Sequence, residues 1–433
     1  MLTCTRPIHH PPVRIALPQN ITRYYIFSLL RGASLGTPIV LWVVFLQQHY
    51  GFSMTEVVLL DLPFWVGKFL FEIPTGVVAD KFGRRVSLAI SAVMSSLIWM
   101  VFALSGSFWV LAMAQFVGAL AATFQSGADE ALLFESLQAA GREQDYARIS
   151  ARAGAVGTLS SMLAGLVVGL IAATNLVLPV VLTSLLTALT LIPILGMKET
   201  VGTAGALPVG TAGALPADKG PAAPASEGPP AAAQDSYLSI VHQAFAALRE
   251  QAILRWAAAY LVLLGCVSFY AVTFLQPYTL EVGLPLAALG PVMVAVQGMS
   301  VAGALAVPLA LRILGSRVLL FGVPLLLVPG LVLIGLAPGW PVLVVAALLS
   351  FLFSLTQPVL LAVLQSRASN QARATLLSIQ SLLSTVFLTF TEPPLGISAD
   401  RFGVASAYLW MAGLVAIFLV SLLLRGRRSL DLM

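Results

Sequence analysis

The chain has 433 residues, of which 59% are hydrophobic and 9% carry a charge, with a formal net charge of +5. Its mean hydropathy of +0.95 is far above that of a soluble domain with a hydrated surface, so the composition indicates an integral membrane protein. We attribute the small positive charge to membrane topology, and we expect no nucleic-acid partner.

The apolar runs predict an all-α integral membrane fold. They are about 20 residues long or more, whereas the strands of a membrane barrel need roughly 9–11 residues. The N-terminal tail lacks the apolar core and cleavage site of a signal peptide, so the first span is the expected insertion signal. Twelve transmembrane helices are predicted, at residues 22–47, 54–77, 86–106, 108–134, 150–173, 176–196, 253–275, 286–311, 318–337, 341–364, 376–397 and 405–424.

Six predicted spans lie on each side of a polar break. Residues 199–236 are rich in Ala, Gly and Pro and contain VGTAGALP twice in succession, which is typical of a flexible linker. The predicted domains are an N-terminal six-helix bundle over residues 1–198, a cytoplasmic linker over 199–236, and a C-terminal six-helix bundle over 237–433 that begins with a helix on the membrane surface.

The Lys and Arg residues predict the orientation in the membrane. With a cytoplasmic N-terminus, 20 of the 23 lie in cytoplasmic segments, Arg401 alone lies outside, and Arg31 and Lys68 lie within spans. Because basic residues are enriched in cytoplasmic loops, both termini and the linker are expected in the cytoplasm.

Charged residues within the spans are concentrated in the first six helices. A charge near the bilayer centre costs about 2.5–3.5 kcal/mol, so it needs a partner or a water-filled cavity. Helical spacing places Asp61, Lys68 and Glu72 on one face of the second span, and Arg31 lies at a depth where it can meet Glu72. A static salt-bridge network and a set of proton-coupling groups both explain such residues. The set comprises Arg31, Asp61, Lys68, Glu72, Asp129 and Glu130, with Asp129 and Glu72 as the first candidates for the proton carrier.

A skeleton of seven residues occurs twice in the chain. FEIPTGVVADKFGRR at 71–85 ends the second span, and FTEPPLGISADRFG at 390–403 ends the eleventh. A degenerate third copy, PLALRILGSR at 308–317, follows the eighth span. Seven aligned identities are more than short turns rich in Asp and Gly require, so the pattern indicates related segments.

The organisation resembles the major facilitator superfamily. The residues that carry the resemblance match that superfamily's signature between the second and third helices, and they are Gly76, Asp80, Lys81, Gly83, Arg84 and Arg85. The stretches EIPTGVVAD at 72–80, SGADEALLFESL at 126–137 and RATLLS at 373–378 look like a bacterial, drug-efflux-like branch. The resemblance implies two six-helix bundles with inverted three-helix repeats, in the plasma membrane of a bacterium.

The resemblance also implies a gating latch on the cytoplasmic side. In the family, the acid and base of this loop contact neighbouring helix ends when the transporter faces outward. We carry this role over to Gly76, Asp80, Gly83, Arg84 and Glu135. Nested inversion of the repeats explains the outside copy of the skeleton, where Asp400 is expected to matter less because no bases follow Gly403.

In that fold the first, fourth, seventh and tenth helices line the substrate cavity. The wall residues implied are Thr37, Trp42, Gln125, Tyr270, Thr273 and Gln357. Uncharged polar and aromatic walls that face an acidic half favour a lipophilic or cationic solute. The fifth span lacks the glycine-proline signature of the superfamily's drug and proton antiporters.

Other activities are disfavoured. The sequence contains no nucleotide-binding loop and no nucleophile, base and acid constellation, so we expect neither an ATP-driven pump nor an enzyme, and no cofactor. The adjacent His9 and His10 lack partners for a metal site.

The sequence therefore predicts a monomeric secondary active transporter in the lipid bilayer, which exports small lipophilic or cationic compounds and is coupled to protons. The alternatives are a proton-linked importer or facilitator of a metabolite, and a receptor-like relative that does not transport.

Overall fold

The computed structural model describes residues 17–199, 252–337, 339–366 and 370–426, and within them every regular element is helical. Residues 200–236 of the predicted linker and the predicted surface helix that follows lie outside the described residues. Each predicted span coincides with a helix or with two consecutive helices.

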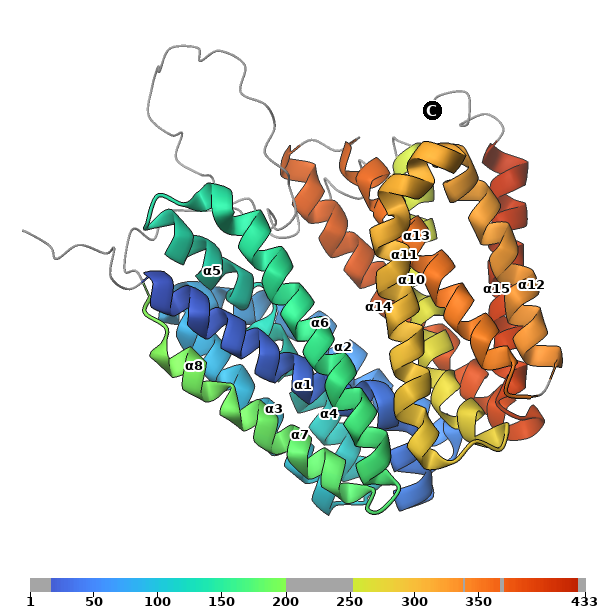
Figure 1. Cartoon of the computed structure of the whole chain (residues 1–433), viewed down its shortest axis with the longest axis horizontal. Coiled ribbons are helices and arrows are strands. Elements are labelled where there is room, and N and C mark those ends of the chain that lie inside the picture. Colours follow the sequence, from blue (N-terminus) through green and yellow to red (C-terminus); the bar gives the residue numbers. More distant parts are fainter. Residues whose placement is uncertain (1–16, 200–251, 338, 367–369, 427–433) are drawn as a thin grey trace, which may run out of the picture.

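The helices of residues 17–196 form one group, which we call the first group. In the group α1 packs against α6, α2 against α4, and α3 against α4 and α7. Figure 1 shows these helices, coloured blue to green, side by side. The group consists of α1 (Leu17–Tyr50), α2 (Met54–Phe82), α3 (Arg84–Leu104), α4 (Phe108–Gln125), α5 (Ala128–Gln138), α6 (Tyr146–Ala172), α7 (Val177–Leu189) and α8 (Leu191–Gly196).

The helices of residues 252–426 form the second group, coloured yellow to red in Figure 1. Here α11 packs against α13, α12 against α15 and α13, and α10 against α13 and α14. A π-helical turn at Val318–Gly322 joins α11 to α12. The group consists of α10 (Ala252–Glu281), α11 (Leu289–Arg317), α12 (Val323–Leu336), α13 (Val342–Ser366), α14 (Asn370–Phe402) and α15 (Ala405–Gly426).

Length and composition allow eight stretches of the described chain to cross a membrane. Large apolar side chains on their flanks are exposed, for example Leu104 and Leu305, as expected where hydrocarbon is the solvent. The predicted spans at 54–77, 376–397 and 405–424 are helical but are not among the eight. The eight are Gln19–Tyr50, Arg84–Leu104, Phe108–Gln138, Glu143–Ala172, Val177–Gly196, Arg255–Glu281, Leu286–Leu336 and Val342–Ala362.

Glycines in left-handed conformation end the helices that carry the repeated skeleton. Gly83 follows α2 with φ 99°, Gly403 follows α14 with φ 86°, and Gly315 interrupts α11 with φ 74°. Side chains rarely adopt this conformation, so glycine is required there. The three copies of the skeleton therefore share a backbone feature as well as residues, and α2 and α14 run about one turn beyond the predicted spans.

The fourth predicted span is interrupted. Sequence periodicity predicts one helix over 108–134, but α4 ends at Gln125 and α5 begins at Ala128. Gly127 between them has φ 76°, which no α-helix accommodates. The break makes Asp129 and Glu130 part of the first turn of a new helix.

The two groups touch near one end of the molecule. We call it the contact end, and it carries Tyr50, Met54, Gly283 and Phe402. Cross-group packing joins α2 to α14, α1 to α10, and α6 to α11. Figure 1 shows the groups meeting there and diverging toward the opposite end. The opposite end, which carries Gly83, Glu199 and Arg317, is the linker end.

Candidate transport site

A cavity of about 190 Å³ lies between the two groups. Its wall combines aromatic rings from α2 and α10, hydroxyl groups from α14 and the Lys68 ammonium group. This volume lies below the roughly 300–1,000 Å³ that is usual for small-molecule sites in proteins, so only a small solute fits the cavity as described. The lining residues are Trp65, Lys68, Gly265, Cys266, Phe269, Ser381, Ser384, Thr385 and Leu388.

Two buried carboxyl groups, one from each group, lie at the contact-end side of this cavity. Asp61 of α2 is 7% exposed and Glu392 of α14 is fully buried. The Gln115 side chain donates a hydrogen bond to Asp61 over 2.9 Å, whereas both carboxyl oxygens of Glu392 lack a hydrogen-bond partner within the described part of the chain. Asp61 and Glu392 repel each other through space when both are charged.

A third buried acid, Asp129, is paired. Asp129, in the first turn of α5, lies 2.7 Å from the Arg31 guanidinium and also accepts the Glu130 backbone N–H at 2.9 Å. A carboxylate in the first turn is favoured by the helix dipole. Arg31 therefore pairs with Asp129 and not, as the depth argument suggested, with Glu72, whose side chain is exposed.

Two of the predicted latch residues, Arg84 and Glu135, meet at the linker end. Arg84 Nε lies 3.6 Å from Glu135 Oε1. The N-terminus of α3 is capped by Glu199, which accepts the Arg85 backbone N–H. A Cβ atom on Gly83 would lie 2.6 Å from Glu199 Oε2, so a larger residue there would displace the Glu199 side chain. The side chains at positions 76 and 80 lie outside the described residues.

At the contact end, Asp400 of α14 caps α2 of the other group. Its carboxylate accepts the backbone N–H of Met54 at 2.7 Å and that of Thr55 at 2.8 Å, together with the Thr55 hydroxyl. Ser53 and Glu56 complete a capping box at the same helix start. The copy of the skeleton at residues 390–403 thus joins the two groups, a role that the sequence did not predict for it.

Gln276 of α10 inserts into α1. The Val43 N–H donates to its side-chain oxygen at 2.8 Å, and its amide nitrogen donates to the Ile39 carbonyl at 3.0 Å. In an uninterrupted helix Val43 and Ile39 bond to each other. The Gln276 amide therefore bonds to both backbone groups of one turn of α1, next to Pro38.

Glycines let the backbones of the two groups approach closely. A Cβ atom on Gly290 of α11 would lie 2.5 Å from the Gly165 carbonyl oxygen of α6, and one on Gly396 of α14 would lie 3.0 Å from the Thr55 Cα atom of α2. Such distances are shorter than almost any real Cβ contact, so glycine is what allows these backbones to meet.

The residues expected in the cavity wall line neither of the two cavities described. Thr37 bonds to the Pro179 carbonyl at 3.3 Å, and Trp42 packs edge-on against Trp99 and Phe102. Thr273 bonds to the carbonyl of its own helix, Tyr270 bonds to Thr391, and Gln357 is exposed. Neither these residues nor Gln125 line either cavity.

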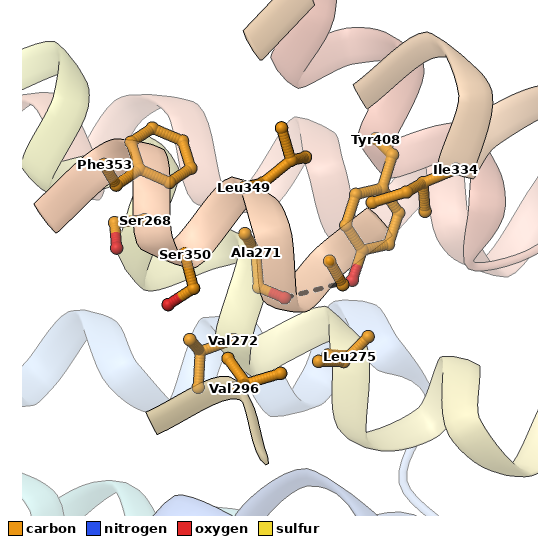
Figure 2. Close-up of a pocket in the computed structure, with 11 residues that line it drawn as sticks. Ser268, Ala271, Val272, Leu275, Val296, Ile334, Leu349, Ser350, Phe353 and Tyr408 are labelled. Carbon is orange, nitrogen blue, oxygen red and sulfur yellow. Dashed lines mark hydrogen bonds between the residues drawn. The ribbon is translucent and has the colours of Figure 1, made fainter. Parts of the chain in front are cut away.

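A second cavity lies within the second group (Figure 2) and measures about 10 Å³. Tyr408 donates a hydrogen bond to the Ala271 carbonyl at its edge. The volume is about that of one water-sized sphere, so it holds no solute.

Sequence reasoning missed the roles of Gln276 and Asp400 and left Glu392 outside the coupling set. A signal was present for Glu392, which is an acid within a predicted span, whereas Gln276 and Asp400 follow the ends of predicted spans. Their partners lie more than 230 positions away in the chain, and helical periodicity carries no information on such contacts.

The comparisons with known proteins point to one family. A sequence model of the Major Facilitator Superfamily matches residues 24–387. An uncharacterized MFS-type transporter, YxaM of Bacillus subtilis (strain 168), is 32% identical over 108 residues, which is 25% of this chain and 27% of that protein.

Solved structures share the fold at low sequence identity. A mutant of the nucleoside transporter NupG superimposes with a TM-score of 0.73 at 14% identity, covering 93% of this chain and 99% of that one. A bacterial homologue of the human lysosomal transporter Spinster, inward-facing and unoccupied, gives a TM-score of 0.63 at 16% identity, with 95% of both chains covered.

Proposed function

Because the chain belongs to the major facilitator superfamily, a family of membrane transporters and not of enzymes, we propose that it is a secondary active transporter with two six-helix halves that work by alternating access. The observation that carries the proposal is that the cross-group contacts gather at the contact end. Two bodies that close at one end and diverge at the other are what alternating access requires.

The proposed topology puts the linker end in the cytoplasm. The basic residues support it, because 20 of the 23 lie in segments that the sequence predicts to be cytoplasmic. The contact end is then outside, and the chain as described is in an inward-facing state. Asp400, Gln276 and the glycine contacts close the outer side, and the Arg84 and Glu135 pair belongs to the latch that closes the inner side in the opposite state.

For the solute, the 190 Å³ cavity supports a small, uncharged compound with an apolar or aromatic part. Trp65 and Phe269 offer rings, and the α14 hydroxyls offer hydrogen bonds. Lys68 on the wall repels a cation, so of the two predicted classes the lipophilic one is favoured. We propose proton-coupled export of such compounds as a member of the drug-efflux-like branch.

Import of a polar metabolite is the second candidate. The α14 hydroxyls beside aromatic rings also suit a ring compound with hydrogen-bonding groups, and one protein with the same fold is a nucleoside transporter. Solutes from a thermal-stabilisation screen would be tested for flux into and out of vesicles with purified protein, with and without a pH gradient. Gradient-driven flux supports the proposal, its direction separates the two candidates, and binding without flux would indicate a receptor.

Cysteine labelling tests the topology. In a variant with Cys4 replaced by serine, a cysteine at the exposed Gln144 of the linker end should resist a membrane-impermeant thiol reagent in intact cells, because we place this end in the cytoplasm. A cysteine at the exposed Ser107 of the contact end should react. Reaction at position 144 alone would reverse the topology.

The latch prediction concerns Arg84. Arg84→Ala and Asp80→Asn should leave the protein inserted but lower the flux about tenfold or more, because inner closure in the outward-facing state loses about 1.4 kcal/mol. Arg142→Ala is the control, since Arg142 pairs with Asp145 within one loop. Equal flux in the Arg84 and Arg142 variants would remove Arg84 from the latch.

A further inference from the structure

We propose that the buried acids Glu392 and Asp61 together form the proton-binding site of this chain at the interface between the two groups, with the proton on Glu392. The inference rests on the proposed transport function and names the groups that couple it to protons. It replaces Asp129 and Glu72 as the first candidates.

The burial of Glu392 is the first step. Its side chain is fully buried, and neither carboxyl oxygen has a hydrogen-bond partner among the described residues. A carboxylate without donors or a cation is costly to bury, whereas a neutral carboxyl group is tolerated. Glu392 therefore carries a proton in the state described.

Asp61 differs from Glu392 in its hydrogen bonds. Gln115 donates to its carboxylate at 2.9 Å. An anion that accepts a hydrogen bond is less costly to bury than one that accepts none, so of the two acids Glu392 is the one that holds the proton. A neutral Glu392 also avoids repulsion between two anions across the interface.

The cavity gives this pair a route to one side only. α14 runs from the linker end to the contact end, so its lining residues Ser381 to Leu388 lie on the linker side of Glu392. α2 runs the other way, and Trp65 and Lys68 lie on the linker side of Asp61. On the opposite side Gly396 packs against Thr55 and closes the path. Neither acid lines the 190 Å³ cavity, but Trp65 and Leu388 of its wall each lie one helical turn from an acid. We therefore assign proton exchange to the linker side while the contact end is closed.

The other titratable groups around Glu392 do not neutralise it. Lys68 of α2 makes no ion pair within the described part of the chain and lies about two turns from Asp61. Cys266 and Tyr270 of α10 are near Glu392 but bond to the Ser384 carbonyl and to Thr391. α15, which packs against α14, contributes only Tyr408 among its described side chains, and Tyr408 bonds to the Ala271 carbonyl.

Coupling follows from the position of the pair. When the proton leaves, two carboxylates face each other between α2 and α14, and their repulsion favours separation of the groups at the contact end. Acidic conditions should therefore stabilise contact-end closure, and alkaline conditions should favour its opening.

Infrared spectroscopy of the full-length protein in lipid vesicles tests the site. We expect a carbonyl band of a protonated carboxyl group that disappears as the pH is raised. Glu392→Gln should remove this band, Glu392→Asp should keep it at a shifted frequency, and Glu143→Gln, at an exposed acid, should leave it unchanged. No such band at any pH, or the same band in Glu392→Gln, would overturn the proposal.

A distance measurement separates this site from the proposed function. Spin labels at Ser107 and Trp340, both exposed at the contact end, should move apart in wild type at alkaline pH. Glu392→Gln should abolish the pH dependence of this distance, and the Glu143→Gln control should retain it. Retention in Glu392→Gln would overturn the site alone, whereas a distance independent of pH in wild type, beside solute flux independent of a pH gradient, would overturn proton coupling itself.

Discussion

Gly290→Val should abolish transport while the protein remains folded and inserted. A Cβ atom at this position would lie 2.5 Å from the Gly165 carbonyl oxygen and 3.0 Å from that of Leu166. Both are backbone atoms of α6, which cannot rotate away as a flexible side chain can. Since the contact joins the two groups, its loss leaves the interior of each group unchanged but prevents closure of the contact end.

The measurement for Gly290→Val combines solute flux in vesicles with thiol labelling at the contact end. We expect a loss of flux of about tenfold or more, equivalent to roughly 1.4 kcal/mol against closure, and faster labelling of a cysteine near the interface. Gly413→Ala is the matched control, because Gly413 is also helical and a Cβ atom there meets nothing within 4 Å. Wild-type flux in Gly290→Val would show that closure of this contact is not part of the cycle.

Asp400→Ala should open the contact end. The Asp400 carboxylate accepts two backbone N–H groups and a hydroxyl at the start of α2, and these groups are left without that partner when the contact breaks. Hydrogen bonds to charged groups contribute about 1.5–3 kcal/mol each when shielded. Because Asp400 is exposed, we expect about 1–2 kcal/mol in total, a shift of roughly 5- to 30-fold toward the open state.

Label distances at the contact end measure the Asp400→Ala shift. Ser53→Ala is the control, because it weakens the capping of α2 within the first group only and should leave the equilibrium between end states unchanged. Asp400→Asn retains one acceptor and should fall between wild type and Asp400→Ala. If Asp80→Asn changed this distance and Asp400→Ala did not, closure of the contact end would depend on the other copy of the skeleton.

Much of the fold follows from the sequence because hydrocarbon demands long apolar helices, and these are visible as runs of residues. The helix ends are less predictable. α2 continues to Phe82 past two charged residues, Asp80 and Lys81, because the signature loop is itself helical up to Gly83. The break at Gly127 was also missed, since glycine is common within membrane spans and its left-handed conformation depends on the surrounding packing.

The sequence predicted only those contacts of the candidate site that join neighbouring helix ends, and it missed those that depend on how the two groups dock. The Arg84 and Glu135 pair joins neighbouring helix ends, and both residues are charged, so depth along the helices was enough to bring them together. Asp61 and Glu392 belong to α2 and α14, whose contact depends on how two whole groups dock. Gln276 is neutral, and its hydrogen bonds to the backbone of α1 are visible only in the folded structure.

The most direct test of alternating access measures both ends of one molecule. One label pair at Ser107 and Trp340 reports on the contact end, and a second pair at Gln144 and Ser316, exposed positions of the linker end, reports on the other. Across a series of pH values and in the Gly290→Val variant, we predict that the contact-end distance increases whenever the linker-end distance decreases. Two distances that stay fixed, or that increase together, would contradict alternating access in this chain.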